Sequence, residues 1–566
     1  MKKITILFFC CLILFQSCGN KIEKDIEFKD GSKIISIELN EQKIQDLKTL
    51  GLVWGFLKYY HPNIASGNRN WDFELFRMLP NVINSKNNND RDRYLCKWVN
   101  SLGEYKSEKQ IKSQKLEIKL SPDLIWISKS DFTDSLTLQL SSIVNAKRSV
   151  NNYYVNLAPN VGNPTFDKEA PYSEMIYPDA GYRLLSLYRY WNIIQYYFPY
   201  KYLIEEDWKD VLEEFIPKFI LAKNETEYQL AILELMARVH DTHANFTDGK
   251  LFKYWGINKP AFDIKFIEDN AVVTDYLDVE LSKDIGLKIG DEIIAVNGKT
   301  VPEIVQDQIK YTPSSNYPTQ LRNISKRILR TNDSILTIEY KSDEEIRTEI
   351  VKTYIVSEFY DYYNKPKDRP SFKLISENIA YLYLGSIESA GLQKIFNEIA
   401  NTKGVIIDLR CYPSEFLVFS IGKYLMPEKT EFVKFSNGSI ENPGQFTFNK
   451  SLEVGEKNND YYKGKVVILI NETTQSQAEY TTMAFRVAPN AIVIGSTTAG
   501  ADGNVSTIYL PGNIRTMISG IGVYYPDGTE TQRIGIVPDI EIKPTIEGIK
   551  NNKDELLEKA IELIEE

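Results

Sequence analysis

Histidine is scarce in this sequence: the 566 residues include only three, His61, His240 and His243. Neutral imidazole is the usual general base near pH 7 and a frequent metal ligand, so this scarcity leaves few candidates for either role. Positive charge is also in deficit, because 77 acidic residues outnumber 67 basic ones and give a net charge of −10. A nucleic-acid partner demands a basic surface, so the charge balance argues against that class of function.

The apolar run at the N-terminus, Ile4 to Phe15, is too short to cross a bilayer of roughly 30 Å as a helix. It follows two lysines and precedes small residues, so a secretory signal is favoured over a transmembrane anchor. The stretch also resembles a bacterial lipoprotein signal, which is cleaved before a cysteine that then carries lipid; here that residue is Cys18. The resemblance implies an exported cell-envelope lipoprotein, anchored by lipid and expected at the outer membrane, facing the periplasm or the surface. A plain signal peptide cut nearby is the alternative.

Cysteine is too rare for a disulfide framework. Cys10 and Cys11 would leave with the signal and Cys18 would be acylated, so only Cys96 and Cys411 remain. Two thiols so far apart form neither a disulfide framework nor a zinc knuckle. We expect each to pack as a small buried hydrophobic residue.

Two segments of the N-terminal half repeat each other. WGFLKYYHP begins at Trp54 and WNIIQYYFP begins 137 positions later, at Trp191. The same offset relates three further pairs: Trp71 and Trp208, Leu75 and Leu212, and Pro80 and Pro217. The apolar spacing of residues 207–222 and 227–239 fits two helices. The sequence therefore predicts a duplicated helical module over residues 19–110 and 181–250, rather than a solenoid, which needs three or more shorter repeats.

The repeat separates the three histidines. His61 corresponds to Phe198 in this register, which favours an aromatic packing role for His61. His240 and His243 follow the last helix of the second copy and have no counterpart in the first. Between the copies, in residues 111–180, alternating apolar residues in KLEIKL and SLTLQL predict strands before an irregular linker rich in proline, glycine and asparagine.

Short strands are expected in residues 255–357. In GLKIGDEIIAVNGKTV, Gly290 and Asp291 would turn into a strand over 292–296, and Asn297-Gly298 is a strong signal for a tight hairpin. SILTIEYKS and EIRTEIVKTYIV would supply a closing hairpin. The first stretch resembles the core of a PDZ domain of the protease-associated kind. Such a domain binds an extended peptide at a sheet edge, which implies a polypeptide partner.

Strands and helices alternate from about Phe372 onward. The continuously apolar strands GVIIDL and VVILI each lie close to a helix, as a sheet covered on both faces requires. We expect an α/β core over residues 368–550, with a site at its strand ends, and a C-terminal helix over 551–566. The predicted fold class is α/β plus all-α, in several domains.

Ser476 stands where VVILINETTQSQAEYTTMAF passes from a buried strand through a turn into a helix. A serine there can present its hydroxyl while the following backbone amides stabilise an oxyanion. From the spacing alone, the stronger alternative is an ordinary N-cap, with Glu479 completing a capping box.

Six motifs in order are similar to those of the tail-specific and tricorn-core family of serine peptidases: HDTHANF, GLKIGDEIIAVNGKTV, GVIIDLR, TTQSQAE, VIGSTTAG and DGTETQRIGIVPDIEI. The similarity covers roughly residue 183 to the C-terminus. It implies a peptidase core of the ClpP/crotonase type with Ser476 as the nucleophile.

The resemblance also bears on the base. The tail-specific branch uses a lysine in a TxGKG context, whereas this sequence has Ala501 at that position. The tricorn-core branch uses a histidine in an SH pair ahead of the PDZ domain. DTHA matches that pair, which implies His243 as the base and Thr242 as its orienting neighbour.

Further site residues follow from the same branch, in which a glutamate before the terminal GxxPD motif orients the histidine through a second serine. Glu530 or Gln532 is expected in this role, since both would point to one face of an extended strand. The backbone N–H groups of Gln477 and Ser414 are the expected oxyanion donors. Ser414 stands in the turn CYPSEF, where a glycine is usual.

A zinc site could be drawn from His240 and His243 with Glu234 and Asp241 nearby, but the HExxH pattern and any cysteine ligand are lacking. We therefore expect neither a metal nor another cofactor. We assign His240 to a helix end, where the helix dipole stabilises a cation.

The sequence therefore predicts a serine endopeptidase that works through an acyl-enzyme. Two alternatives remain: an inactive peptide-binding lipoprotein that uses the PDZ-like groove, and a carrier of small hydrophobic ligands. The altered CYPSEF turn favours these alternatives, whereas the serine, the histidine and the GIVPDI tail favour the enzyme.

Overall fold

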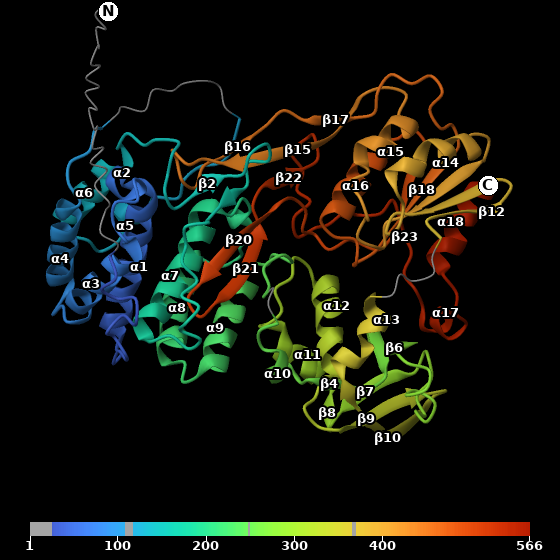
Figure 1. Ribbon diagram of the computed structural model, residues 1–566, viewed down its shortest axis with the longest axis horizontal. Helices are drawn as coiled ribbons and strands as arrows, with labels where there is room; N and C mark the ends of the chain where they lie inside the picture. Colours follow the sequence, from blue (N-terminus) through green and yellow to red (C-terminus); the bar gives the residue numbers. More distant parts are fainter. Residues whose placement is uncertain (1–24, 108–116, 247–248, 365–369) are drawn as a thin grey trace, which may run out of the picture.

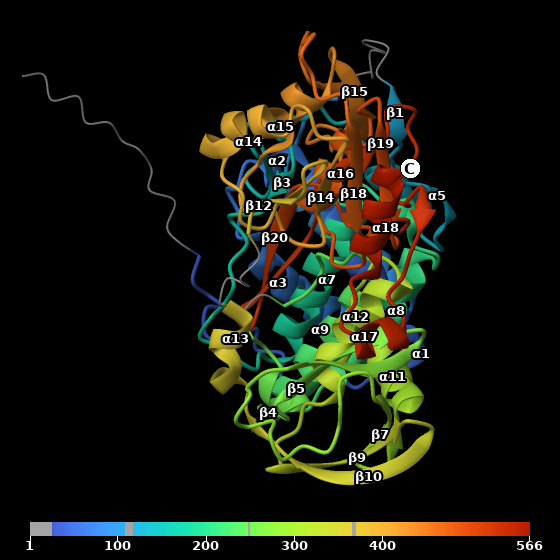
Figure 2. The same ribbon diagram turned by 90° about the vertical axis from the view of Figure 1, so that its right-hand side faces the viewer.

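The computed structural model describes residues 25–107, 117–246, 249–364 and 370–566 (Figure 1). The predicted lipoprotein signal, with Cys18, lies outside these residues. None of the helices within the described ranges is both long and apolar enough to cross a membrane. The chain forms a helical region, a smaller domain with an antiparallel sheet, and an α/β core; the smaller domain lies at one end of the molecule in Figure 2.

The helical region contains both copies of the repeat. The first copy consists of α1 (Glu41–Tyr60), α2 (Pro62–Ala65), α3 (Trp71–Ile83) and α4 (Asn88–Ser101), and the second of α7 (Ala180–Tyr197), α8 (Trp208–Leu221) and α9 (Glu225–Ala237). Between them lie β1 (Ile118–Leu120), α5 (Trp126–Lys129), α6 (Asp134–Val144), β2 (Asn156–Leu157) and β3 (Pro164–Thr165).

A reciprocal pair of hydrogen bonds between tryptophans recurs in both copies. Trp54 Nε1 donates to Trp71 O and Trp71 Nε1 donates to Trp54 O, both at 3.0 Å. In the second copy Trp191 Nε1 donates to Trp208 O at 2.6 Å and Trp208 Nε1 to Trp191 O at 3.1 Å. The tryptophans therefore fix the packing of the long helix on the following one in the same way twice.

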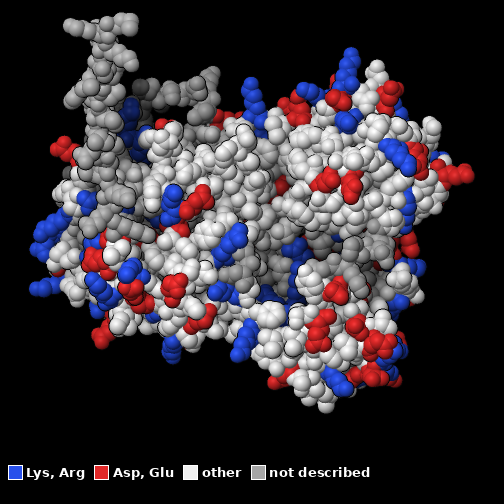
Figure 3. Space-filling view, in the orientation of Figure 1, with Lys and Arg blue, Asp and Glu red and all other residues white. Residues whose placement is uncertain are grey.

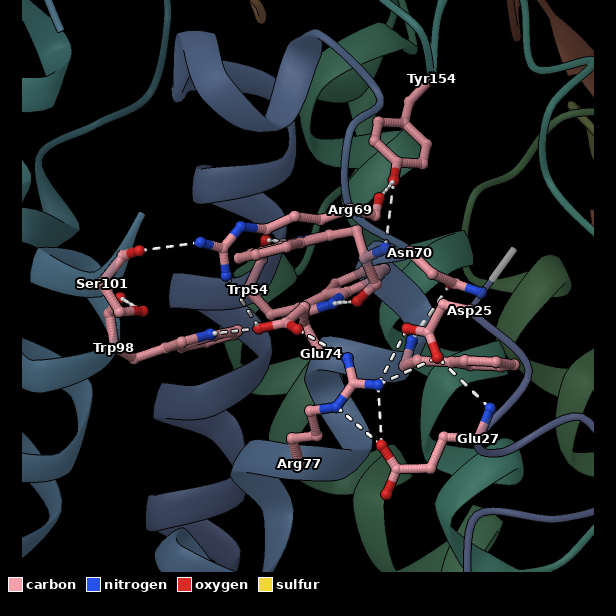
Figure 4. A network of polar contacts seen from close by, with 12 residues as sticks. Asp25, Glu27, Trp54, Arg69, Asn70, Glu74, Arg77, Trp98, Ser101 and Tyr154 are labelled. Carbon is pink, nitrogen blue, oxygen red and sulfur yellow. Dashed lines mark hydrogen bonds and ion pairs between the residues drawn. The ribbon is translucent and has the colours of Figure 1, made fainter. Parts of the chain in front are cut away.

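The first described residues are bound to the first copy by Arg77 of α3. Its guanidinium contacts Asp25 at 2.9 Å and Glu27 at 2.8 Å, and also Glu74 one turn earlier at 2.7 Å (Figure 4). These carboxylates raise the pKa of Arg77 despite its partial burial. The segment ahead of α1 is thus held against α3 by charge.

Two expectations, one about a strand and one about burial, are wrong. SLTLQL lies in α6, not in a strand, because the buried residues Leu136, Leu140 and Ile143 follow a helical spacing while Leu138 is 70% exposed. Cys96 and Cys411 are half-buried rather than fully buried. The thiol of Cys96 donates to the Ser135 hydroxyl, 3.7 Å away, in an exposed setting.

The smaller domain is built around one antiparallel sheet with strand order β10-β9-β7-β6-β5. Its elements are β5 (Phe262–Ile267), β6 (Asn270–Tyr276), β7 (Glu292–Val296), β8 (Lys299–Thr300), α11 (Val301–Ile309), α12 (Tyr317–Ile328), β9 (Ile335–Ser342) and β10 (Glu345–Lys352). Short elements flank it: α10 (Phe252–Trp255), β4 (Asn258–Lys259), β11 (Tyr354–Ile355) and α13 (Tyr360–Asn364). The expected tight hairpin is confirmed, since Asn297 and Gly298 both have positive φ, at 50° and 77°.

The α/β core contains a sheet with strand order β12-β13-β14-β18-β19-β23, parallel from β13 onward. The strands are β12 (Phe372–Ser376), β13 (Ile379–Tyr383), β14 (Gly404–Asp408), β18 (Lys465–Ile470), β19 (Ala491–Gly495) and β23 (Ile540–Glu541). Helices α14 (Leu392–Glu398), α15 (Val418–Leu425) and α16 (Gln477–Phe485) cover one face, and α18 (Glu555–Glu565), which follows α17 (Ile546–Lys550), covers the other. The expected sheet covered on both faces is confirmed.

Two extensions join the core to the helical region. A sheet of β15 (Thr430–Gly438), β16 (Phe446–Phe448), β17 (Leu452–Val454) and β22 (Gly522–Tyr524) also pairs with β1. The hairpin of β20 (Val505–Leu510) and β21 (Ile514–Ser519) lies against α7 and α9 (Figure 1). Its apolar side chains belong to the same hydrophobic core as the helical copies. Residues from the C-terminal part of the chain therefore help to complete the helical core.

Charge is mixed over the surface. On the face drawn in Figure 3, acidic and basic side chains are interspersed rather than gathered by sign. This face offers no continuous basic surface of the kind that phosphate backbones require.

Candidate active site

Ser476 occupies a strained turn between β18 and α16. Its backbone has φ 55° and ψ −119°, whereas an ordinary N-cap residue has extended geometry. The Ser476 N–H donates to the Glu479 carboxylate at 3.0 Å, so Glu479 does reach back as in a capping box. A positive φ at a non-glycine residue costs on the order of 1–3 kcal/mol and is typical of a nucleophilic serine presented at a strand-to-helix turn.

Glu479 organises this turn from within the core. It is fully buried and accepts the N–H groups of Ser476 at 3.0 Å, Gly500 at 2.8 Å and Ala501 at 3.1 Å, and the hydroxyl of Thr498. Burial raises the pKa of Glu479, although these donors act in the opposite direction. The carbonyl of Ala501 also accepts from Ser476 N at 3.0 Å. The position that holds a lysine base in the tail-specific branch is therefore adjacent to Ser476 and carries only a methyl group.

His243 follows α9 in a loop that folds around a buried carboxylate. Asp241 accepts the His243 N–H at 3.1 Å in an Asx-type turn. It also accepts the N–H and the hydroxyl of Ser519, the last residue of β21, at 2.6 and 3.0 Å. The Ser519 oxygen lies 2.9 Å from Nδ1 of His243. These contacts form a chain from Asp241 through Ser519 to the imidazole.

The chain fixes the tautomer of His243. A carboxylate only accepts hydrogen bonds, so Ser519 must donate its single hydroxyl proton in the bond to Asp241. The Ser519 oxygen therefore accepts from Nδ1–H of the imidazole, which leaves Nε2 unprotonated when the ring is neutral. Nε2 is the nitrogen able to take a proton.

Asp241 remains ionised in this environment. Burial alone would raise its pKa, but hydrogen bonds and the charge of His243, together with the Ser519 N–H, bring the pKa below its usual value. Gln532 adds a donor, with Nε2 at 3.4 Å from Asp241 Oδ1. An ionised Asp241 suits the stabilisation of a positive imidazolium through Ser519.

Ser476 and His243 line the same pocket, which has a volume of about 970 Å³. The structure thus brings together two predicted site residues from opposite halves of the chain. The pocket is also lined by Tyr412 and Phe416 from the CYPSEF turn. Gln477 ties that turn to α16, because its side-chain amide donates to Glu415 O at 2.7 Å. Its own N–H lies in the first turn of the helix, where backbone donors have no acceptor within the helix.

Three predicted site residues contact other groups instead. Glu530 binds Lys119 at 2.6 Å and Tyr202 at 3.1 Å, because the chain turns after Glu530 and the expected shared strand face with Gln532 does not form. The Thr242 hydroxyl bonds to Ser315 at 3.0 Å and to the Ala499 carbonyl at 3.2 Å, so Thr242 anchors the loop rather than the imidazole.

Ser414 is the third. Its N–H donates to Leu384 O at 2.9 Å and its hydroxyl donates to Ile387 O at 2.6 Å. A backbone N–H that already donates to a carbonyl is not free to bind an oxyanion in this conformation. The N–H of Gln477, the other predicted oxyanion donor, lies in the first turn of α16.

His240 differs from its expected role as a cation at a helix end. It lies beyond α9, with φ 53°, and is half-buried. Burial and the positive charge of Arg533 lower its pKa, so the neutral form is favoured. His61 is buried with its ring edge-on to Tyr105, and its Nδ1 accepts the N–H of Asn63 at the start of α2. His240 and His61 therefore lie outside the hydrogen-bond chain from Asp241 through Ser519 to His243.

Sequence reasoning missed Ser519 and did not assign Asp241 a role in the hydrogen-bond chain to His243. Asp241 could have been found, because an aspartate two residues before a candidate base can form an Asx-type turn around it. Ser519 lies in no motif, and only the position of the β20–β21 hairpin brings it to His243. In the described part of the chain, no group of three or more His, Cys, Asp or Glu side chains is placed to hold a metal ion.

Comparison with known proteins gives a family match over part of the chain and a likeness to solved structures. Residues 378–542 match the model of a family described as Peptidase family S41. No curated protein matches the chain. Mature CPAF complexed with lactacystin is similar with a TM-score of 0.54 and 14% identity, over 68% of this chain and 98% of that chain. For mature CPAF the values are 0.52 and 13%, over 67% and 96%.

These structural likenesses show a shared fold over about two thirds of this chain, whereas the family match is confined to the α/β core that carries Ser476. The family match over residues 378–542, the part of the chain that carries Ser476, supports a serine peptidase.

Proposed function

We propose that the protein is a serine endopeptidase in which Ser476 is the nucleophile and His243 is the general base. One observation carries the proposal: the chain Asp241–Ser519–His243 ends in the pocket that Ser476 also lines. Ser519 and Asp241 are positioning residues, which hold the imidazole with Nε2 available. Glu530 and Thr242, which contact other groups, have no part in this assignment.

The reaction follows from these positions. His243 Nε2 takes the Ser476 hydroxyl proton as Oγ attacks the peptide carbonyl carbon, and the imidazolium then gives that proton to the departing amine as the C–N bond breaks. Water hydrolyses the resulting ester by the same proton transfers in reverse order. The Gln477 N–H and the N-terminal end of α16 stabilise the oxyanion, and Asp241 stabilises the imidazolium through Ser519.

The small domain has a role in binding the substrate in this proposal. We assign residues 255–357 to a PDZ-like domain, supported by the sheet order β10-β9-β7-β6-β5 and the two helices packed on it. An extended polypeptide could add to an end strand of that sheet through main-chain hydrogen bonds. Attachment to a cell-envelope membrane through lipid at Cys18 is also proposed, on the N-terminal sequence alone.

Labelling with a fluorophosphonate probe tests the nucleophile. The wild-type protein should become labelled, since the probe traps a serine activated by a base, and Ser476→Ala should not. His243→Ala should label at least about 100-fold more slowly, because the loss of a triad base typically lowers the rate by far more than this.

His61→Ala serves as the matched control, because His61 caps α2 away from the pocket and its loss should not change labelling. Circular dichroism confirms that each variant is folded. If the folded wild type stays unlabelled and still binds peptides, the inactive peptide-binding alternative replaces the proposal.

A further inference from the structure

Asp502 is a buried carboxyl group in the wall of the proposed active-site pocket. The residue is 3% exposed and lines the same pocket as Ser476 and His243. Its Oδ1 accepts the neighbouring Gly503 N–H at 2.6 Å, while Oδ2 is buried with no hydrogen-bond partner in the described part of the chain. A buried polar oxygen without a partner is costly, so its position in the pocket wall calls for an explanation.

The reaction proposed above does not use Asp502. It is not one of the contacts of His243, Ser519 or Asp241, and the turn of Ser476 is held by Glu479 and Ala501. Burial and the nearby charge of Glu479 raise its pKa well above the usual value for aspartate. The buried setting therefore favours the protonated acid, and a positive charge placed beside it would favour the carboxylate.

Aromatic rings form another wall of the pocket. Tyr480 stacks on Phe416, with ring centroids 5.8 Å apart and planes at 22°, and on Phe435 at 6.0 Å and 24°. All three residues line the pocket, and Phe416 is 55% exposed. Flat rings of this kind pack against an alkyl stem and attract a cation over their faces.

We propose that Asp502 and the Phe416–Tyr480–Phe435 wall form a subsite for a lysine or arginine side chain next to the scissile bond. The proposal rests on the proposed function, and it specifies the substrate as polypeptides with a basic residue at the cleavage site. The aromatic rings would bind the apolar stem, and the buried carboxylate would pair with the charged end. Lys450 also lines the pocket, but it is exposed, so water screens its repulsion.

A charge at the end of the side chain distinguishes this subsite from a purely apolar one. Arginine and citrulline have nearly the same shape and differ in charge, and lysine differs from norleucine by its ammonium group. An apolar pocket would prefer norleucine and would gain nothing from arginine over citrulline, whereas pairing with a buried carboxylate rewards the charge.

The test begins with the full-length protein and a degenerate peptide library, with cleavage sites mapped by mass spectrometry. Peptides matched except for arginine or citrulline, or lysine or norleucine, at the mapped position are then compared by kcat/KM. We expect wild type to prefer each charged member by at least about tenfold, the lower end of what a buried charge pair contributes. In Asp502→Asn the ratio within each pair should fall to near one.

Glu453→Gln is the matched control, because Glu453 is exposed on β17 beside the pocket residue Leu452 and its change removes one negative charge without touching the subsite. This variant should keep the wild-type ratio. A wild type that cleaves citrulline or norleucine peptides as well as their charged counterparts overturns the proposal.

Fluorophosphonate labelling separates the two levels of failure. A protein that labels at Ser476 but shows no preference for charge is a peptidase without this subsite. If Asp502→Asn is labelled less efficiently than wild type, the kcat/KM ratio is measured for Asp502→Glu instead. That variant keeps the charge and should retain part of the preference. A protein that does not label at all contradicts the proposed function itself.

Discussion

At the scale of single residues, the position of one proton determines what His243 can do. Asp241 accepts a hydrogen bond from the Ser519 hydroxyl, so the imidazole must donate from Nδ1, and Nε2 is the nitrogen that can take a proton. A serine between carboxylate and imidazole transmits orientation and charge less directly than a contact between the two, whose nearest atoms are 3.6 Å apart here. Because Asp241 contacts the imidazole through the Ser519 hydroxyl, the arrangement needs the serine as well as the carboxylate.

Asp241→Asn should lower kcat by about 10²–10⁴-fold with a much smaller change in KM, since the amide favours the wrong tautomer and provides no charge for the imidazolium. Steady-state kinetics on a mapped peptide measure both parameters. Asp527→Asn is the control, because Asp527 is exposed and its carboxylate accepts the N–H of Thr529. This variant should leave kcat and KM unchanged. A loss confined to KM would show that Asp241 acts on substrate binding instead.

The same carboxylate contributes to stability in a pH-dependent way. Its pKa is lowered in the folded protein, so the contribution is present above the unfolded value of about 4 and is lost as the pH falls through the folded value. The difference in unfolding free energy between wild type and Asp241→Asn should therefore be largest near neutral pH and shrink below pH 4, as urea titrations at several pH values would show.

At the scale of elements, the turn from β18 into α16 depends on one buried carboxylate. Glu479 accepts three backbone N–H groups and one hydroxyl from both sides of the turn. Because the φ of Ser476 is unfavourable by itself, these bonds offset the strain. The sequence did indicate this element, since strand, turn and helix follow from local pattern and the spacing of Ser476 and Glu479 suggested their contact.

Glu479→Gln should destabilise the protein by about 2–4 kcal/mol, because an amide nitrogen would face backbone N–H donors that now meet a carboxylate oxygen. The rate of fluorophosphonate labelling should fall too, as the turn relaxes from its strained conformation. Chemical denaturation and labelling kinetics measure these effects. Glu398→Gln, on the exposed side of α14 in the same core, is the control and should change neither. Wild-type stability in Glu479→Gln would show that the strain is held by other contacts.

At the scale of the whole molecule, the two helical copies meet across α1 and α7. A Cβ at Gly51 would lie 2.7 Å from the Tyr188 ring, and one at Gly55 would lie 1.8 Å from the Asn192 side chain. Tyr188 and Asn192 are the counterparts of these glycines in the second copy, at the same offset of 137. The copies have thus diverged in a complementary manner, with small residues on one helix and large ones on the other.

Gly55→Ala should destabilise the protein by about 1–3 kcal/mol, as overpacking of a close helix crossing does. An alanine in place of an exposed helical glycine would instead stabilise by up to about 1 kcal/mol. Thermal unfolding measures the sign of the change. Gly391→Ala is the control, since its nearest contact would be an ordinary 3.9 Å. A rise in the melting temperature of Gly55→Ala would contradict the close crossing.

The sequence by itself determined the features that depend on neighbouring residues. The duplicated register, the buried parallel strands, the Asn297-Gly298 hairpin and the strand-to-helix turn at Ser476 all follow from periodicity and local turn chemistry. The strand predicted for SLTLQL did not form. A short apolar run fits the spacing of a strand and of a helix equally well, and the helix was favoured by Ile143, which lies beyond the run and is buried with Leu136 and Leu140.

Only the tertiary structure decided the partners of His243. Ser519 is 276 positions away, and it reaches the imidazole because the β20–β21 hairpin packs its apolar side chains into the helical core. The same packing sends Glu530 to Lys119 and leaves Gln532 near Asp241. Such contacts depend on where the hydrophobic effect places whole elements, and this placement is not encoded in the residues next to any one side chain.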